Sequence, residues 1–315
     1  MDPRTRVEEL AEQAYRRATA EALRHALAVQ SEVVRAMGDF LRSRGFIEIR
    51  PVILSPITDP LRHATGRAEV EYYGHRYQLT RSMIFHKQVA VLSHERIFAF
   101  SPNVRLEPVE LADTGRHLVE FTQLDLEVRG ATREEVMALG EELLIYTLSW
   151  VWEHCREALA FFGRELRIPA RPFRRITYRD AYDRYGGNFE IILSQQSEEP
   201  LWIVDMALEA REFYDREDPE RPGTLVDMDL LYPEGYGEAL SGGEREHILE
   251  RILSRMERMG LDPEEYRLYL EIAQRGLPPS AGFGIGVERL ARFICGLKRI
   301  EDGLLFPKVP GTLSL

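Results

Sequence analysis

Apolar residues near the start of the chain recur every three to four positions, which is the spacing of one face of a helix. They predict a helix over about residues 5–44 that Gly45 closes as a C-cap. The same spacing predicts further helices over residues 82–93, 133–162, 244–259, 263–274 and 287–295. Alternating or short apolar runs predict strands over residues 46–53, 77–79, 96–107, 117–128, 224–232, 236–241 and 281–286.

The strands predicted over residues 96–107 and 117–128 form an antiparallel hairpin with an irregular tip. This element count predicts an α+β fold, in which helices flank a mostly antiparallel sheet. No shift in composition divides the chain, so we expect a single domain over residues 1–315. The segment 55–75 is a long loop rich in proline, glycine and charge, and loops of this length often serve function.

Composition narrows the class of protein. Of the 315 residues 44% are hydrophobic and 30% are charged, as in a soluble globular protein. The net charge of −11 argues weakly against a nucleic acid as the main partner. The charged N-terminal residues are unlike a signal peptide and no apolar run is long enough for a membrane span, so we expect a cytoplasmic protein without a membrane partner. Cys155 and Cys295 are predicted to be buried free thiols.

One face of the predicted hairpin carries an unusual set of polar side chains. Strand periodicity places together Arg105, Glu107, Phe121, Gln123, Asp125 and Glu127. A face this charged is unsuited to a plain core, because burying an unpaired charge is costly. It indicates either a binding site or a solvated hairpin with cross-strand ion pairs.

A second pattern is the segment AGFGIGVERL at residues 281–290, where a strand runs directly into a helix. Alternating glycines allow a flat ligand to lie against the backbone. Arg289 follows at the start of the helix, where an anion is favoured. Taken alone, the segment could equally be a tight strand-to-helix turn.

Together these patterns resemble motifs 2 and 3 of class II aminoacyl-tRNA synthetases, over about residues 96–128 and 281–295. The less specific motif 1 corresponds to about residues 24–56, and the sequence RHLVEFTQLDLE at residues 116–127 resembles the aspartyl, asparaginyl and lysyl subgroup. The resemblance implies the synthetase fold, a homodimer, ATP as co-substrate and Mg²⁺. It implies ATP-binding residues Arg105, Glu107, Arg116, His117, Phe121, Glu238, Gly286 and Arg289, with Mg²⁺ held by Glu238 and Asp229. Arg105 and Arg289 would also be catalytic.

Two further segments concern the amino acid. Residues 82–88 and 237–246 resemble segments of aspartyl-tRNA synthetases, and they imply the substrate-binding residues Ser82, Lys87, Gln123, Asp125 and Arg245. Two cations with an orienting carboxylate, Asp125, would suit a second substrate carboxylate. This interpretation favours aspartate over asparagine.

The chain begins close to the motif 1 helix, so we expect no anticodon-binding domain and no tRNA partner. Segments such as 55–60, 82–88 and 213–217 resemble the archaeal-type asparagine synthetase A family. That resemblance implies an aspartate–ammonia ligase, which makes asparagine from aspartate, ATP and ammonia through β-aspartyl-AMP and releases AMP and diphosphate. Asp59 would be the carboxylate that helps ammonium to lose its proton.

Two alternatives remain open from the sequence. One is a stand-alone adenylating paralogue that transfers an activated amino acid to a protein or a modified tRNA. The other is an inactive regulatory or binding protein descended from a synthetase, against which the intact set of Arg105, Glu107, Glu238 and Arg289 argues.

Overall fold

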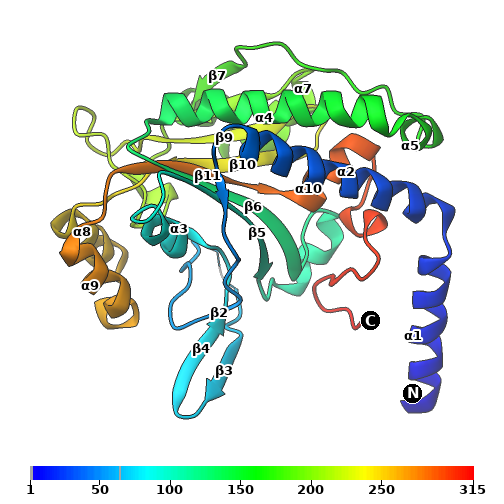
Figure 1. Cartoon of the computed structure of the whole chain (residues 1–315), viewed down its shortest axis with the longest axis horizontal. Coiled ribbons are helices and arrows are strands. Elements are labelled where there is room, and N and C mark those ends of the chain that lie inside the picture. Colours follow the sequence, from blue (N-terminus) through cyan, green and yellow to red (C-terminus); the bar gives the residue numbers. More distant parts are fainter. Residues whose placement is uncertain (1–2, 64) are drawn as a thin grey trace.

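The computed structural model describes residues 3–63 and 65–315, and its main element is a sheet of eight strands (Figure 1). The strand order is β1-β5-β6-β11-β10-β9-β8-β7, and neighbours run antiparallel except for the outer pairs β1–β5 and β7–β8. The strands are β1 Ile47–Glu48, β5 Arg96–Val104, β6 Glu120–Arg129, β7 Arg174–Thr177, β8 Leu201–Val204, β9 Asp227–Tyr232, β10 Gly237–Glu244 and β11 Ser280–Gly286. The predicted α+β class and the predicted hairpin, now β5 and β6, are confirmed.

Helices cover one face of this sheet (Figure 1). They are α2 Glu21–Ser43, α4 Arg133–His154, α5 Arg156–Phe161 and α10 Val287–Cys295. The sequence explains the ends of these helices, since Thr132 and Glu135 form a capping box before α4 and Gly296 ends α10 in the left-handed region. The main hydrophobic core lies between these helices and the sheet, and it contains both cysteines as free, buried thiols.

The opposite face of the sheet carries smaller elements. They are α3 Ile84–Ala90, the sheet of β2 Leu54–Ser55, β4 His75–Leu79 and β3 Glu69–Tyr72, and the pair α8 Leu249–Met259 and α9 Arg267–Gly276. A second core of aromatic and aliphatic side chains joins α3 to α8 and α9. The remaining helices are α1 Pro3–Ala18, α6 Tyr178–Tyr185 and α7 Phe189–Gln196. No helix in the described ranges is long and apolar enough to cross a membrane.

Several predicted boundaries are wrong. The helix predicted over residues 5–44 is two helices that break at Thr19 and Ala20, and the helix predicted over 133–162 breaks at Cys155. The hairpin β3–β4 replaces a single short predicted strand. Its two-residue turn, Tyr73 and Gly74, has positive φ at both positions. Such a turn is usually recognised by the sequence Asn-Gly, and the tyrosine at its first position explains why it was not predicted.

Candidate active site

Two adjoining cavities open on the face of the sheet that carries α3. The larger has a volume of about 250 Å³ and the smaller about 50 Å³. Both are lined by Arg105, Gln123 and Glu238, which therefore stand at their junction. A site of this shape can hold two chemically different groups in contact with each other.

The residues singled out in the sequence are brought together by the fold. The larger cavity is lined by Asp59, Ser82, Lys87, Gln123, Asp125 and Arg245. The smaller is lined by Glu107, Arg116, His117, Phe121, Gly286 and Arg289. Asp229 lines neither cavity and is buried on the neighbouring strand β9.

Strand alternation explains how β6 contributes to both the core and the site. Leu124 and Leu126 point into the main core, and the residues between and beside them point to the other face. Gln123 and Asp125 consequently line the larger cavity. Glu127 is fully buried beneath it, where it contacts Lys87 and Arg245.

Strand β11 shows the same alternation with glycine on the site face. Ala281 and Phe283 lie in the core, while Gly284 lines the larger cavity and Gly286 the smaller one. Gly282 has a different reason to be glycine, because a Cβ there would collide with the Leu126 carbonyl and the Glu127 carboxylate. Close packing of the sheet, and not ligand contact, therefore requires glycine at position 282.

We expect Gly282→Ala to lower the free energy of unfolding by about 3 kcal/mol, since neither colliding group is free to move. The matched control is Gly286→Ala on the same strand, where the nearest atoms to a new Cβ belong to Arg289 at 3.6 Å. That control should lose less than about 1 kcal/mol. Urea unfolding measures both, and equal losses would contradict the steric account.

The smaller cavity is lined by three arginines, Arg105, Arg116 and Arg289, and by three glutamates, Glu107, Glu238 and Glu288. Burial, with Arg289 and Arg116 nearby, lowers the pKa of His117 to about 4, so this cluster repels a further proton. The Arg105 guanidinium lies 5.1 Å from the centre of the Phe121 ring. Glu107 accepts a hydrogen bond from His63 at 3.1 Å. The arrangement suits a ligand that is anionic at one end and aromatic at the other.

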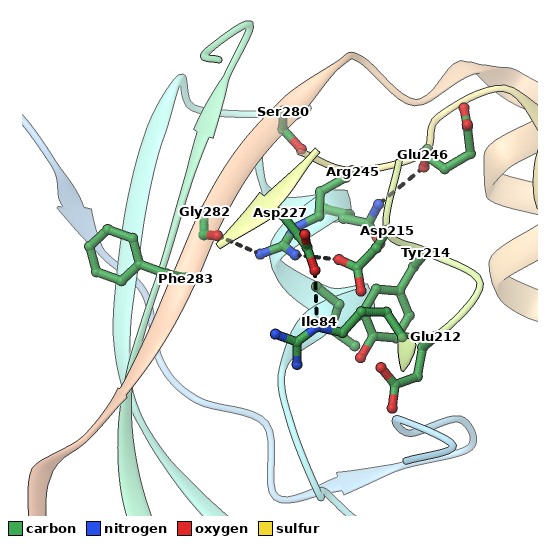
Figure 2. A network of polar contacts seen from close by, with 12 residues as sticks. Ile84, Glu212, Tyr214, Asp215, Asp227, Arg245, Glu246, Ser280, Gly282 and Phe283 are labelled. Carbon is green, nitrogen blue, oxygen red and sulfur yellow. Dashed lines mark hydrogen bonds and ion pairs between the residues drawn. The ribbon is translucent and has the colours of Figure 1, made fainter. Parts of the chain in front are cut away.

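The larger cavity ends in a buried ion network that contains more carboxylates than cations. Lys87 donates to Asp125 at 3.0 Å and lies 3.8 Å from Glu127. Arg245 donates to Glu127 at 3.1 Å. It also donates to Asp215 at 3.1 Å, as Figure 2 shows. The two cations thus face three carboxylates, and all five side chains are buried.

This network differs from the one expected from the sequence. Asp125 pairs with Lys87, whereas Arg245 is held by Glu127, Asp215 and the Gly282 carbonyl, the last at 2.8 Å. The Asp125 Oδ2 atom is buried without a hydrogen-bond partner among the described residues. The positive charges of Lys87 and Arg245 are already compensated by these carboxylates. The two side chains therefore offer no surplus positive charge for a second substrate carboxylate.

Both carboxylate oxygens of Asp59 accept hydrogen bonds from the protein, which the sequence did not predict. Tyr214 donates to one carboxylate oxygen at 3.0 Å, and the amide of Leu61 donates to the other at 3.1 Å. Ser82 accepts from the amide of Ile84 at 3.1 Å at the start of α3. Both side chains are buried and help to shape the cavity wall.

Sequence reasoning gave no site role to one wall of the larger cavity, although residues 213–217 were noted for a family resemblance. It comes from the segment between β8 and β9, and it consists of Ala210, Arg211, Glu212, Tyr214 and Asp215. The run of charged and aromatic residues at positions 209–217 is a usable signal, but it belongs to no regular helix or strand beyond the short turn Leu208–Ala210. Only the folded chain shows that this segment faces the cavity.

The sheet order, the helices on one face and the two-part polar site on the other define a class II aminoacyl-tRNA synthetase fold. The model of the family described as tRNA synthetases class II (D, K and N) matches residues 6–310, and the chain belongs to this family. Members of this class are ligases that use ATP and Mg²⁺.

Individual relatives give the same result. The chain is 31% identical over 305 residues to an asparagine–tRNA ligase of Thermus thermophilus. The aligned region covers 89% of this chain and 68% of that protein. The chain is also 31% identical over 313 residues to an asparagine–tRNA ligase of Symbiobacterium thermophilum, covering 91% and 70%. The structure of asparaginyl-tRNA synthetase from Pyrococcus horikoshii, complexed with asparaginyl-adenylate, matches with a TM-score of 0.90 and 27% identity over 98% of this chain and 74% of that one.

These relatives correct the sequence-based function. The prediction of an aspartate–ammonia ligase of the asparagine synthetase A type is wrong, and so is the exclusion of tRNA, because the matched proteins are asparagine–tRNA ligases. With ammonia no longer a substrate, Asp59 loses the role predicted for it. The net charge of −11 was a poor guide to the partner, since a net charge says nothing about how charge is distributed over the surface. The homodimer stays a prediction.

The acidic residues predicted to hold Mg²⁺ carry the oxygen ligands that this ion prefers, but each is paired with an arginine. Asp229 lies 2.5 Å from Arg211, and Glu238 accepts from Arg289 at 3.1 Å. Burial, with the charges of Asp229 and Glu238, raises the pKa of Glu190 to about 7, so a third carboxyl group stands near them. The described residues contain no group of three or more ligands arranged to hold a metal alone, but Mg²⁺ commonly takes one or two carboxylates together with phosphate and water.

Proposed function

We propose that this chain activates asparagine with ATP and transfers the activated amino acid to tRNA. One observation carries the proposal: the two cavities meet at Arg105, so an amino acid in the larger and a nucleotide in the smaller would touch at one guanidinium. The similarity to asparagine–tRNA ligases supports the choice of substrates.

The first step joins the amino acid to AMP. An oxygen of the α-carboxylate attacks the α-phosphorus of ATP, a new O–P bond forms, and diphosphate leaves with the electron pair of the broken bond. Two anions must approach one another, so Arg105 at the junction neutralises charge and fixes the line of attack. Arg116, His117 and Arg289 would hold the outer phosphates, and Phe121 offers a ring face to the base.

A bound Mg²⁺ would neutralise phosphate charge during this step, and Glu238 with Asp229 would hold it.

In the second step a ribose hydroxyl at the 3′ end of tRNA attacks the carbonyl carbon of the adenylate. The ester bond forms, AMP leaves, and the hydroxyl proton is released. The buried walls around Lys87 and Arg245 protect the mixed anhydride from water meanwhile.

The charge balance of the larger cavity supports asparagine over aspartate. A second carboxylate would join three carboxylates that already compensate Lys87 and Arg245. A neutral carboxamide adds no charge, and its N–H groups match the unpartnered Oδ2 of Asp125. This reverses the preference for aspartate drawn from the sequence.

We expect asparagine to exceed aspartate about 100-fold in kcat/KM for ATP–diphosphate exchange, because like charges brought together in a buried site repel. Exchange of labelled diphosphate into ATP, measured with each amino acid in turn, checks this. Charging of unfractionated tRNA with labelled asparagine then tests the second step. Ammonium should change neither rate.

The proposal fails if no amino acid supports exchange, or if exchange occurs and tRNA is never charged. A preference for aspartate in the same assay would overturn the choice of amino acid while leaving the adenylation chemistry intact. Lys87→Met serves as a matched variant, since it should raise the KM for asparagine far more than the KM for ATP.

A further inference from the structure

Three carboxylates line one side of the larger cavity, and two of them have partners. Asp59 accepts from Tyr214, and Asp215 accepts from Arg245. Glu212 stands on the same wall with 8% of its surface exposed. Its carboxylate is hydrogen-bonded to its own backbone and forms no ion pair with a cation within the described ranges. Figure 2 shows Glu212 beside Tyr214, on the side of Asp215 away from Glu246.

The two arginines near Glu212, Arg211 and Arg255, already interact with other groups. Arg211 lies 3.1 Å from Asp227 and 2.5 Å from Asp229. Arg255 donates to backbone carbonyls, among them that of Glu212 itself at 2.8 Å, and its side chain forms no ion pair with the Glu212 carboxylate. Burying a carboxylate without a cation costs free energy. The Glu212 carboxylate lies at the cavity wall, where a cation supplied by a ligand would compensate its charge.

We propose that Glu212 binds the ammonium group of the amino-acid substrate and thereby helps to select an α-amino acid. The inference rests on the proposed function, since it assumes that the larger cavity holds an amino acid. The ammonium of such a substrate stands one carbon from the reacting carboxylate, which Arg105 would receive at the cavity junction. The carboxamide would then point toward Lys87 and Asp125.

The surroundings of Glu212 make its charge depend on pH. Burial, beside Asp59 and Asp215, raises the pKa of Glu212 to about 7. The charged and titratable groups that face it are Asp59, Arg211, Tyr214, Asp215 and Arg255. Bound ammonium stabilises the ionised carboxylate and lowers its pKa, so asparagine should bind more tightly as the pH rises from about 5.5 toward 7.

The test is calorimetric binding of asparagine and of 4-amino-4-oxobutanoate, which is asparagine without its amino group. The wild type should prefer asparagine about 30-fold, the effect of one charge-assisted hydrogen bond in a buried site. Glu212→Gln should remove most of this preference by weakening asparagine alone, and it should abolish the pH dependence. Binding of ATP should not change.

Two variants keep the result interpretable. Glu209→Gln changes an exposed glutamate three residues away and should leave both affinities as in the wild type. Glu212→Asp keeps the charge and should retain part of the preference, which a purely structural role would not require. Unchanged asparagine affinity in folded Glu212→Gln overturns the inference and spares the proposed function. Failure of the wild type to bind asparagine overturns both.

Discussion

Arg105→Ala should lower kcat/KM for asparagine-dependent ATP–diphosphate exchange about 1000-fold, the loss typical of removing a group that stabilises charge in a transition state. Arg105 is one of three residues that line both cavities, and it is the only cation among those three. Its Nε atom donates to the Arg81 carbonyl at 3.1 Å, which fixes the guanidinium before either ligand arrives. Attack of one anion on another needs this fixed positive charge.

Three comparisons make this result specific. Arg179→Ala removes an arginine whose side chain is 89% exposed on α6, and it should leave the exchange rate unchanged. Arg105→Lys keeps the charge without the planar fork and should fall between the two. Urea unfolding of each variant separates catalysis from stability. A loss of less than about tenfold in folded Arg105→Ala would exclude Arg105 from the role proposed for it.

Arg245→Ala should destabilise the protein by about 3–5 kcal/mol, because it leaves buried carboxylates without their cation. Arg245 is 3% exposed and donates to Glu127, Asp215 and the Gly282 carbonyl. In the variant, Lys87 alone would face the three carboxylates of the network. A lower free energy of unfolding in urea, together with a lower midpoint of thermal unfolding, measures the effect.

The matched control for stability is Arg258→Ala. Arg258 lies 4.0 Å from Glu217 and its side chain is 60% exposed, so this surface pair should contribute at most about 1 kcal/mol. Should Arg245→Ala cost no more than Arg258→Ala, the buried network would have to relax or admit water on losing its arginine. The charge argument for asparagine would then need revision.

Much of the fold was predictable because it depends on local periodicity. The β5–β6 hairpin and the passage from β11 into α10 came from alternating or helical apolar spacing. Breaks within helices were harder, since Ala20 and Cys155 are not helix-breaking residues. The β3–β4 hairpin was missed because its turn contains tyrosine at a position with positive φ.

The set of site residues was also largely predictable, whereas their pairing was not. Arg105, Gln123 and Arg289 were singled out from motifs, and each lines a cavity. The partners of Arg245 depend on where the segment containing Asp215 crosses the sheet, and no spacing along the chain encodes that distance. The preference for aspartate followed directly from this gap, because counting Lys87 and Arg245 without their carboxylates overstated the positive charge available to a substrate.

By itself the sequence determined the α+β class, the alternation that sends Leu124 to the core and Asp125 to the site, and 14 of the 29 residues that line the two cavities. These follow from side-chain direction, which a period of two fixes locally. Only the tertiary structure decided that Lys87 and Arg245 are already neutralised, that Gly282 is required by packing, and that Glu212 forms no ion pair with any cation in the described part of the chain. Electrostatic balance and close packing depend on residues far apart in the chain, so they exist only once the chain is folded.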